Sequence, residues 1–372
     1  MGTLVTAAEL GLDPVEVDAR LDAGLNLPSH CYTDRRVFDF EMAAIFDRSW
    51  QYFAPRVRFD RPGDVVVGMV GRTPVIATRG TDGVLRGFVN ACRHRGFTLV
   101  EADTHCTKIQ CAYHSWIYDL DGSLARTPLA EHDPKLVRDE IGLHPVSITE
   151  WGHAAWVNPD PDAMAFLEAH PRLVEAAEDL GIDHVDLDRY RPYTRSVTHQ
   201  ASNWKLWYDN GTECYHCPTV HRQSFGAAYD TSEGFTDWGT WDTLYGSHFT
   251  PTRRAGATMV GGSYRSFQPF PGTQYIQQDG LMIMARAIPT GPASMTFVAD
   301  YLAERDTPDD QVDEWVKLWD LTYEEDARVV ESIQTNLASG RVTELRYIDE
   351  LEGPSRFMHG LIWAAYRRNL AV

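Results

Sequence analysis

Two short segments decide the fold: CAYHSW at residues 111–116 and, upstream of it, CRHRG at residues 92–96. Each segment supplies one thiol and one imidazole, and the four side chains are those of Cys92, His94, Cys111 and His114. A zinc finger usually pairs Cys with Cys in one loop and His with His in the other. One of each per loop suits a 2Fe–2S cluster, with two thiolates on one iron and two imidazoles on the other. A structural zinc site is the alternative, whereas a disulfide would leave the matched histidines unexplained.

The residues around both segments predict a small antiparallel β domain. Short β-rich runs, separated by turns that contain Gly and Asp, occupy residues 64–70, 73–79, 83–92 and 115–124. Such turns between short β-rich runs are typical of hairpins. We therefore expect a β domain over 64–125, with both Cys/His segments at the ends of its strands. Helices are expected near residues 39–53 and 162–181, and strands near 273–289 and 294–304.

A second group of polar residues lies in the segment NWKLWYDNGTECYHCPTVH, residues 203–221. His216 and His221 are five residues apart, so on an unbroken helix they would point about 140° apart and could not share a metal. Pro218 lies between them and breaks the helix. We therefore expect His216 to end a helix and His221 to return from the following turn, so that both can bind one metal. Two hydrogen-bonded core histidines are the alternative.

A long helix is predicted from about residue 308 to residue 339. Thr307, Pro308 and the acids after them are typical of a helix start, and Gly340 is typical of a helix end. One face of this helix carries Val312, Val316, Trp319, Tyr323, Asp326, Val330, Ile333 and Leu337. That face is apolar or aromatic except for one carboxylate.

Asp326 is that exception, and it is a candidate metal ligand. A carboxylate on a buried face is costly unless something positive pairs with it, and a metal ion or an Arg near the surface would both serve. Two histidines and one carboxylate leave open positions for O₂ in non-haem Fe(II) oxygenases. The neighbouring Glu324 and Glu325 fall beside the apolar face and are expected to be solvated.

These segments together resemble the Rieske non-haem iron oxygenases, in their terminal oxygenase (alpha) subunits. The resemblance covers roughly residues 30–372 and implies a Rieske 2Fe–2S cluster on Cys92, His94, Cys111 and His114. It also implies a mononuclear non-haem Fe(II) on His216, His221 and Asp326, with O₂ as co-substrate. Ser115 departs from the family, which usually has Gly there, and we expect no loss of cluster binding from it.

The family fold is α+β, with a small antiparallel β Rieske domain and an α/β catalytic domain. In the catalytic domain a curved antiparallel sheet surrounds a long C-terminal helix, in a helix-grip-like arrangement. The predicted division is residues 1–50 for an N-terminal helical part of the catalytic domain, 51–160 for the Rieske domain and 161–372 for the catalytic domain.

Glu213 stands three residues before His216, and the resemblance implies that it carries electrons between subunits. In this family a carboxylate at that position contacts the iron-bound His216 and the His114 of a neighbouring subunit, in a head-to-tail ring that is usually a homotrimer. Most aromatic dioxygenases have Asp there. The Glu in this chain resembles the carnitine and quaternary-ammonium monooxygenase branch. Asn210 is a further candidate for the iron pocket.

The resemblance also implies a separate NAD(P)H-dependent reductase, since no dinucleotide-binding G-x-G-x-x-G motif is found. The preferred substrate class is a quaternary amine such as a betaine, carnitine or choline, and the alternative is an aromatic acid or other ring compound. An aromatic pocket suits either one. The candidates are Trp238, Trp241, Tyr245, Phe249, Tyr264, Phe267, Phe270 and Tyr275, and the alternative, which is favoured for most of them, is an ordinary place in the core. Arg253 and Arg254 are candidates to bind a substrate carboxylate.

Composition excludes several other classes of protein. The 34 Lys and Arg against 53 Asp and Glu give a formal net charge of −19, which argues against a nucleic-acid partner. No run is long and apolar enough to span a membrane, and the N-terminus does not resemble a secretory signal. We therefore expect a cytoplasmic protein whose Cys/His clusters bind metal rather than form disulfides. A lone electron carrier or a zinc-stabilised binding module would not need the second site.

Overall fold

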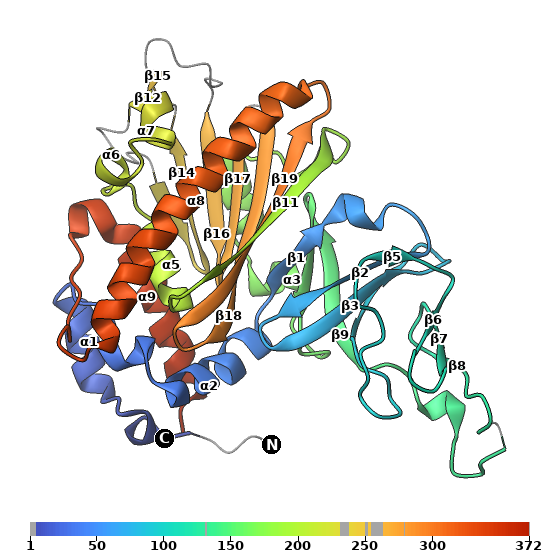
Figure 1. The fold of residues 1–372 in the computed structure, drawn as a ribbon. Helices are drawn as coiled ribbons and strands as arrows, with labels where there is room; N and C mark the ends of the chain where they lie inside the picture. Colours follow the sequence, from blue (N-terminus) through green and yellow to red (C-terminus); the bar gives the residue numbers. More distant parts are fainter. Residues whose placement is uncertain are drawn as a thin grey trace. The chain divides into compact units, whose positions relative to one another are not determined.

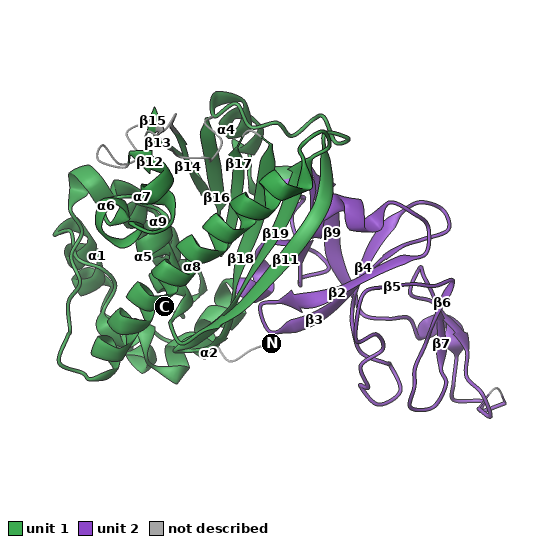
Figure 2. Ribbon diagram, turned by 45° about the horizontal axis from the view of Figure 1, so that its top comes forward, with its two compact units in different colours: residues 1–45, 167–372 green, residues 46–166 purple. Residues whose placement is uncertain are grey.

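The computed structural model describes residues 5–130, 132–230, 238–249, 252–253, 263–278 and 280–371. The chain forms two compact units: unit 1 comprises residues 1–45 with 167–372, and unit 2 comprises residues 46–166 (Figure 2). Unit 2 is therefore an insertion into unit 1. No helix among the described residues combines the length and the apolar character that crossing a bilayer requires.

The inserted unit is built from antiparallel strands. Its larger sheet has the order β1-β10-β9-β4-β3-β2-β5. The strands are β1 (Gln51–Pro55), β2 (Asp64–Val70), β3 (Thr73–Arg79), β4 (Leu85–Val89), β5 (Thr104–His105), β9 (Pro145–Trp151) and β10 (Ala154–Asn158). A three-stranded sheet contains β6 (Lys108–Gln110), β7 (Ile117–Asp119) and β8 (Leu124–Arg126). Short 3-10 helices are η3 (Phe46–Arg48), η4 (Arg56–Phe59) and η5 (Arg138–Glu140).

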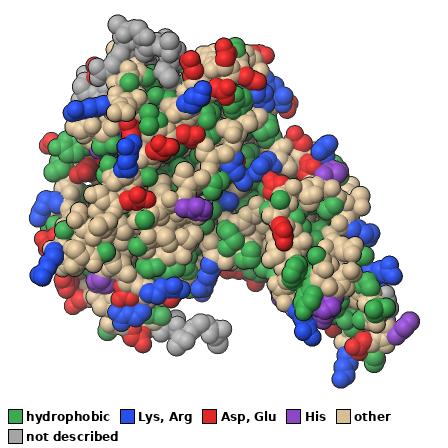
Figure 3. Space-filling model, in the orientation of Figure 1, with side chains coloured by type: hydrophobic (Ala, Val, Ile, Leu, Met, Phe, Trp, Pro, Cys, Tyr) green, Lys and Arg blue, Asp and Glu red, His purple; other side chains and the backbone are tan. Residues whose placement is uncertain are grey.

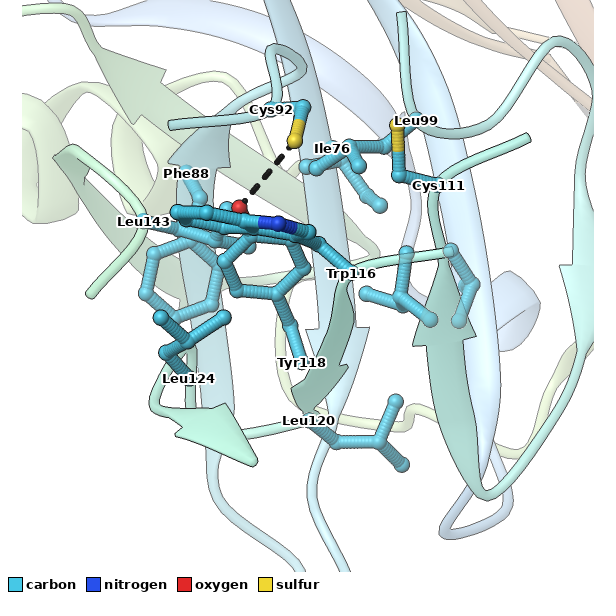
Figure 4. Close-up of a cluster of buried hydrophobic side chains, with 12 residues drawn as sticks. Ile76, Phe88, Cys92, Leu99, Cys111, Trp116, Tyr118, Leu120, Leu124 and Leu143 are labelled. Carbon is cyan, nitrogen blue, oxygen red and sulfur yellow. Dashed lines mark hydrogen bonds between the residues drawn. The ribbon is translucent and has the colours of Figure 1, made fainter. Parts of the chain in front are cut away.

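Alternate residues of β2 and β3 pack into two different apolar clusters. Val65 and Ile76 belong to the cluster that contains Cys92 and Cys111, shown in Figure 4. Their neighbours Val66, Val75 and Ala77 belong to a second cluster. Because successive strand side chains point to opposite faces, this sheet is covered on both sides. The cysteine loops thus rest on a packed core.

Unit 1 is organised around another antiparallel sheet, of order β11-β19-β18-β17-β16-β14-β13. Its strands are β11 (Tyr190–Gln200), β13 (Trp238–Trp241), β14 (Leu244–Phe249), β16 (Tyr264–Pro269), β17 (Thr273–Gln278), β18 (Leu281–Gly291) and β19 (Ser294–Glu304). A separate pair is formed by β12 (Tyr229–Asp230) and β15 (Thr252–Arg253). The predicted α+β class, with a curved antiparallel sheet in the catalytic part, is confirmed.

The helices of this unit include the long α8 (Asp309–Ala338), which lies across one face of the sheet (Figure 1). The others are α1 (Pro14–Asp22), α2 (Arg35–Ala44), α3 (Phe166–Ala169), α4 (Leu173–Asp179), α5 (Trp204–Gly211), α6 (Cys217–Val220), α7 (Phe225–Ala228) and α9 (Asp349–Asn369). Two 3-10 helices, η1 (Ala8–Leu10) and η2 (Ser29–Tyr32), lie near the N-terminus. The first residue of α3 belongs to the inserted unit.

Two predicted helices differ from those observed. The segment 162–181 forms α3 and α4 rather than one helix, because Pro171 interrupts the hydrogen-bond ladder. The helix expected near 39–53 ends at Ala44, and Gln51–Pro55 is a buried strand instead. That strand pairs with β10, so a partner about a hundred residues away in the chain overrides the local helical pattern.

Candidate metal centres

The two Cys/His loops of the inserted unit share one backbone geometry. The N–H of Cys92 donates to the carbonyl of Phe97, and the N–H of Cys111 donates to the carbonyl of Trp116, both at 2.8 Å. Each cysteine carbonyl accepts from the N–H four residues later, of Gly96 and of Ser115. The two loops therefore have the same backbone hydrogen bonds around their cysteines, although His94 follows its cysteine by two residues and His114 by three.

Thiols and imidazoles occupy different environments in these loops. Cys92 and Cys111 are buried, at 3% and 1% exposure, whereas both histidines are exposed. The rings of His94 and His114 lie 4.5 Å apart between centroids. The hydroxyl of Tyr118 lies 3.2 Å from Sγ of Cys92 (Figure 4). Two buried sulfurs and two adjacent exposed rings suit a cluster with a thiolate-bound iron inside and an imidazole-bound iron outside.

The two histidines of the second predicted metal site, His216 and His221, follow the C-terminal end of helix α5 and flank the short helix α6. α5 ends at Gly211, and His216 precedes the first residue of α6 while His221 follows its last. The prediction that His216 ends a helix is wrong, because His216 is the N-cap of α6 and Pro218 occupies the first turn, where proline is tolerated. Gly226 contacts the His221 carbonyl so closely that a Cβ there would lie 2.7 Å from its oxygen.

Three donor atoms converge on one point in this group. Nε2 of His216 and Nε2 of His221 are 3.1 Å apart, and Oδ1 of Asp326 lies 3.4 and 3.2 Å from them. Two ligands at a right angle, each about 2.1 Å from one metal, would be about 3 Å apart. Oδ1 of Asp326 is buried and accepts no hydrogen bond from the described residues. Such an atom fits a metal ion.

Each histidine of this group has a carboxylate on its other ring nitrogen. Nδ1 of His216 donates to Oε1 of Glu213, and Nδ1 of His221 lies 2.9 Å from Oε2 of Glu325. Hydrogen-bonding of Nδ1 leaves the Nε2 lone pair for a metal. The expectation that Glu325 is solvated is wrong, since it is 7% exposed, whereas Glu324 is exposed as expected.

Electrostatics in this group favour a bound cation. Burial by itself lowers the pKa of His216, but the carboxylates of Asp326 and Glu213 outweigh it and raise that pKa to about 10. Burial also lowers the pKa of His221, which Asp326 and Glu325 raise above its usual value. The carboxylates around the two imidazoles thus make this group attractive to positive charge, which a divalent metal ion would supply.

A cavity opens onto these donor atoms. Its lining comprises Trp207, Asn210, Gly211, Glu213, His216, Cys217, His221, Phe225, Tyr264, Gln274, Trp319, Thr322, Tyr323 and Asp326. Asn210 therefore lies at the cavity, as does Glu213. Sequence reasoning missed Trp207, Phe225 and the two aromatic residues of α8 as cavity residues. Trp319 and Tyr323 were assigned only to the apolar face of their helix, and a helical period does not tell a cavity wall from a packed core.

Four of the eight proposed aromatic pocket residues are buried outside the cavity: Trp241, Tyr245, Phe267 and Tyr275. Among those described, Tyr264 lines the cavity, whereas Phe267 and Tyr275 stack on one another at 4.7 Å in the core. The indole N–H of Trp241 donates to Asp179 at 3.3 Å. The side chains of Phe249 and Arg253, and all of Arg254, lie outside the described residues.

A disulfide joins Cys214 and Cys217 and so brackets His216. The expectation that cysteines here bind metal rather than form disulfides is wrong for this pair. The other four cysteines, Cys31, Cys92, Cys106 and Cys111, are free. The sequence does contain a signal for this bond, because Cys214 and Cys217 form a C-x-x-C pair. The histidine between them drew the interpretation to metal binding instead.

Comparison with known proteins finds one matching family domain for each of the two proposed metal sites. Residues 49–140 match the Rieske [2Fe-2S] domain, and residues 187–367 match the catalytic domain of ring-hydroxylating alpha subunits. The chain belongs to the Rieske non-haem iron oxygenases. It is an enzyme of the alpha-subunit type, and the family's cofactors are a 2Fe–2S cluster and a mononuclear iron, with O₂ as substrate.

This Rieske oxygenase has relatives of similar length. It is 28% identical over 334 residues to the carnitine monooxygenase oxygenase subunit of Acinetobacter pittii, which covers 88% of this chain and 89% of the relative. It is 26% identical over 344 residues to the chloroplastic choline monooxygenase of Atriplex hortensis, at 90% and 76% coverage. A solved quaternary ammonium Rieske monooxygenase in complex with L-carnitine superposes with a TM-score of 0.82 at 24% identity, over 95% of this chain and 99% of the other.

Proposed function

We propose that this Rieske oxygenase oxidises a quaternary amine such as a carnitine, betaine or choline, by hydroxylation or by oxidative demethylation. Electrons would come from a separate NAD(P)H-dependent reductase. The single observation that carries the substrate class is a cavity lined by five aromatic rings beside the proposed iron site. The curated relatives named for carnitine and choline oxidation support the same class.

Five aromatic rings line the cavity: Trp207, Phe225, Tyr264, Trp319 and Tyr323. The rings of Tyr264 and Trp319 are stacked with centroids 6.1 Å apart, and Phe225 lies 5.9 Å from Trp319. Trp and Tyr faces attract quaternary ammonium groups by about 0.5–2 kcal/mol each, most strongly where water is excluded. Glu213 adds a carboxylate to the same cavity, whereas the charge of Asp326 would be balanced by the iron. A permanent cation is the ligand that this lining favours.

We assign the cofactors to the residues described above. Cys92, His94, Cys111 and His114 would hold the 2Fe–2S cluster, and His216, His221 and Asp326 would hold the mononuclear iron. The cluster supplies single electrons and the iron supplies O₂ chemistry. The protein's own contribution is to orient the amine against the aromatic walls and to exclude water. Asn210 lines the cavity as a polar neighbour and is a candidate to hydrogen-bond the substrate.

Glu213 is the proposed link between subunits. Its Oε1 accepts from Nδ1 of His216, and its other oxygen accepts from the N–H groups of Tyr215 and His216. We propose that His114 of a second copy contacts this carboxylate, so that the enzyme works as a homotrimer or a multiple of trimers. A cytoplasmic location would suit such an assembly.

Lys and Arg are scattered among Asp and Glu on the face in Figure 3 rather than gathered in one basic patch.

The substrate class is tested with oxygen consumption and product analysis, using a surrogate reductase. The panel contains carnitine, choline and glycine betaine, with aromatic acids as the alternative class. The sharpest control is 3,3-dimethylbutanol, which has the shape of choline and no charge. We expect product from at least one quaternary amine and about tenfold or greater loss of kcat/KM with the neutral isostere, because the cation–π attraction disappears. Turnover of aromatic acids alone would replace this proposal with ring hydroxylation.

A further inference from the structure

The two proposed iron-binding histidines are supported differently. His221 lies between two consecutive residues of α8, with Nδ1 2.9 Å from Oε2 of Glu325 and Nε2 3.2 Å from Oδ1 of Asp326. One helix therefore contacts both nitrogens of the same ring. His216 receives its carboxylate instead from Glu213, in the loop between α5 and α6.

Glu325 and Glu213 differ in what they can contact. Glu213 lines the cavity, whereas Glu325 does not. Glu325 is buried, and its Oε2 also accepts from the hydroxyl of Ser224. A buried carboxylate is held in place by the groups that pair with it, because leaving it unpaired costs several kcal/mol. The contact between Glu325 and His221 is thus independent of substrate and of any neighbouring subunit.

We propose that Glu325 is a positioning residue that sets how tightly the mononuclear site binds its metal, while Glu213 serves electron delivery. Glu325 fixes the proton of His221 on Nδ1, directs the Nε2 lone pair to the metal and makes the imidazole a stronger donor. This inference rests on the proposed ligand set of His216, His221 and Asp326. It assigns different roles to Glu213 and Glu325, although each carboxylate contacts Nδ1 of a proposed iron-binding histidine.

The test measures metal affinity rather than turnover. The full-length protein is depleted of its mononuclear metal and titrated anaerobically with Fe²⁺ and with Co²⁺, whose visible bands report the ligands. Loss of a carboxylate behind a metal-bound histidine typically weakens binding 10–100-fold. We expect that loss for Glu325→Gln, with shifted Co²⁺ bands. Glu324→Gln is the matched control, because it removes the same charge from an exposed neighbour, and should stay within twofold of wild type.

Two further variants separate positioning from simple packing. Ser224→Ala removes the other hydrogen bond to Glu325 and should leave affinity within about threefold of wild type. Glu325→Asp keeps the charge but withdraws it from Nδ1, so it should also weaken binding, and it replaces the Gln variant if that fails to fold. Equal affinity of wild type and either Glu325 variant overturns the inference. Equal affinity of wild type and Asp326→Ala overturns the ligand set instead.

A separate observation concerns the sulfur next to the same site. Sγ of Cys217 lines the cavity region 4.0 Å from Nε2 of His216. Cys217, His216 and His221 each offer a donor atom within 4.8 Å of the others. In the structure this sulfur is bonded to Cys214. A disulfide sulfur is a poor metal ligand, whereas a thiolate is a strong one for soft and borderline ions.

We infer that the Cys214–Cys217 bond is reversible and determines which metal the site prefers. A thiol reductant supplies two electrons and two protons, so that the disulfide becomes two thiols and the reductant becomes a disulfide. A metal ion that binds the freed Cys217 displaces the thiol proton to solvent, so that the thiolate joins His216 and His221 as a ligand. That donor set favours Zn²⁺ over Fe²⁺, because thiolate suits zinc and zinc lies above iron in intrinsic affinity.

Two single variants give opposite results under this inference. Cys214→Ser leaves Cys217 permanently free, whereas Cys217→Ser removes the thiol from the cavity. In anaerobic competition between Zn²⁺ and Fe²⁺ on the full-length protein, we expect at least tenfold higher zinc preference for Cys214→Ser. A phosphine reductant should raise the zinc preference of wild type and leave Cys217→Ser unchanged. Equal preference in both variants, or no effect of the reductant on wild type, refutes it.

Discussion

At the scale of single residues, the two cysteine loops differ in one backbone position. Gly96 has φ +69°, and Ser115, at the equivalent place in the other loop, has φ +58°. An L-residue in this left-handed region crowds its Cβ against the backbone, and Gly does not. The loop with Ser115 therefore carries a small conformational cost that the other loop avoids.

Exchanging these residues tests that cost. Ser115→Gly should stabilise the protein by about 0.5–1 kcal/mol, the gain expected where Gly relieves a left-handed residue. Gly96→Ala should destabilise it by a similar amount, because its Cβ would meet no atom within 4 Å and only the backbone is strained. Thermal unfolding measures both, and the visible absorption of the cluster should be retained. Unchanged unfolding temperatures in both variants would contradict the conformational argument.

His170, a buried histidine that belongs to neither proposed metal site, couples the stability of the protein to pH. Burial lowers the pKa of His170 to about 4, and its Nδ1 lies 2.8 Å from the Thr243 hydroxyl. The unfolded chain takes up this proton near pH 6.5 and the folded chain only near pH 4, so the neutral ring opposes folding as pH falls through that window. Above pH 6.5 it has no such effect.

His170→Asn should therefore lose less stability in acid than wild type. Between pH 7 and pH 5, wild type should lose about 2 kcal/mol more than the variant, because the pKa of His170 falls from 6.5 in the unfolded chain to about 4 in the folded one. Denaturant unfolding at the two pH values provides the measurement. Parallel losses in wild type and variant would show that His170 takes no part in acid sensitivity.

At the scale of elements, α8 contributes a metal ligand, a support for His221 and part of the cavity wall. Asp326 and Glu325 are consecutive, and Trp319 lies two turns earlier on the same helix. The helix packs against the sheet and also against α5 and α7, so its buried arc is wider than one apolar face. This wider arc explains why Glu325 is buried although it lies beside the predicted face.

Two tryptophans of α8 give a matched comparison. Trp319 lines the cavity, whereas Trp315 is buried and does not line it. Trp319→Leu should raise KM for a quaternary amine about 5–30-fold, the equivalent of 1–2 kcal/mol of lost cation–π attraction. Trp315→Leu should lower the unfolding temperature and leave KM unchanged. Steady-state kinetics beside thermal unfolding separate the two, and a KM effect of equal size in both would argue against a cation site at Trp319.

At the scale of the whole molecule, the two proposed metal sites belong to two different compact units of one chain. In the proposed ring assembly, His114 of one copy contacts Glu213 of the next, so that electrons pass from the cluster of one subunit to the iron of its neighbour. A subunit without a cluster and a subunit without an iron would then each retain what the other lacks. Their mixed assembly should work where neither does alone.

Co-expression of His114→Ala and Asp326→Ala subunits tests this arrangement. Each variant alone should be inactive, and the mixed assemblies should recover a fraction of wild-type activity, because some neighbouring pairs combine an intact cluster with an intact iron site. The control is co-expression of Asp326→Ala with the double variant His114→Ala/Asp326→Ala, which holds no iron site. Product formation by mixed and control assemblies alike, or by neither, would exclude electron delivery between subunits.

The sequence by itself determined the features that depend on neighbours in the chain. The Cys/His loops are turns closed within five residues, β2 and β3 have the predicted bounds, and α8 differs by one residue at each end. Only the tertiary structure decided that Glu325 meets His221, 104 residues away, and that α5, α7 and β16 join α8 around one cavity. Local hydrogen bonding and residue period specify turns and helices. Which side of a helix meets a partner depends on packing between distant segments, and no periodic pattern encodes that.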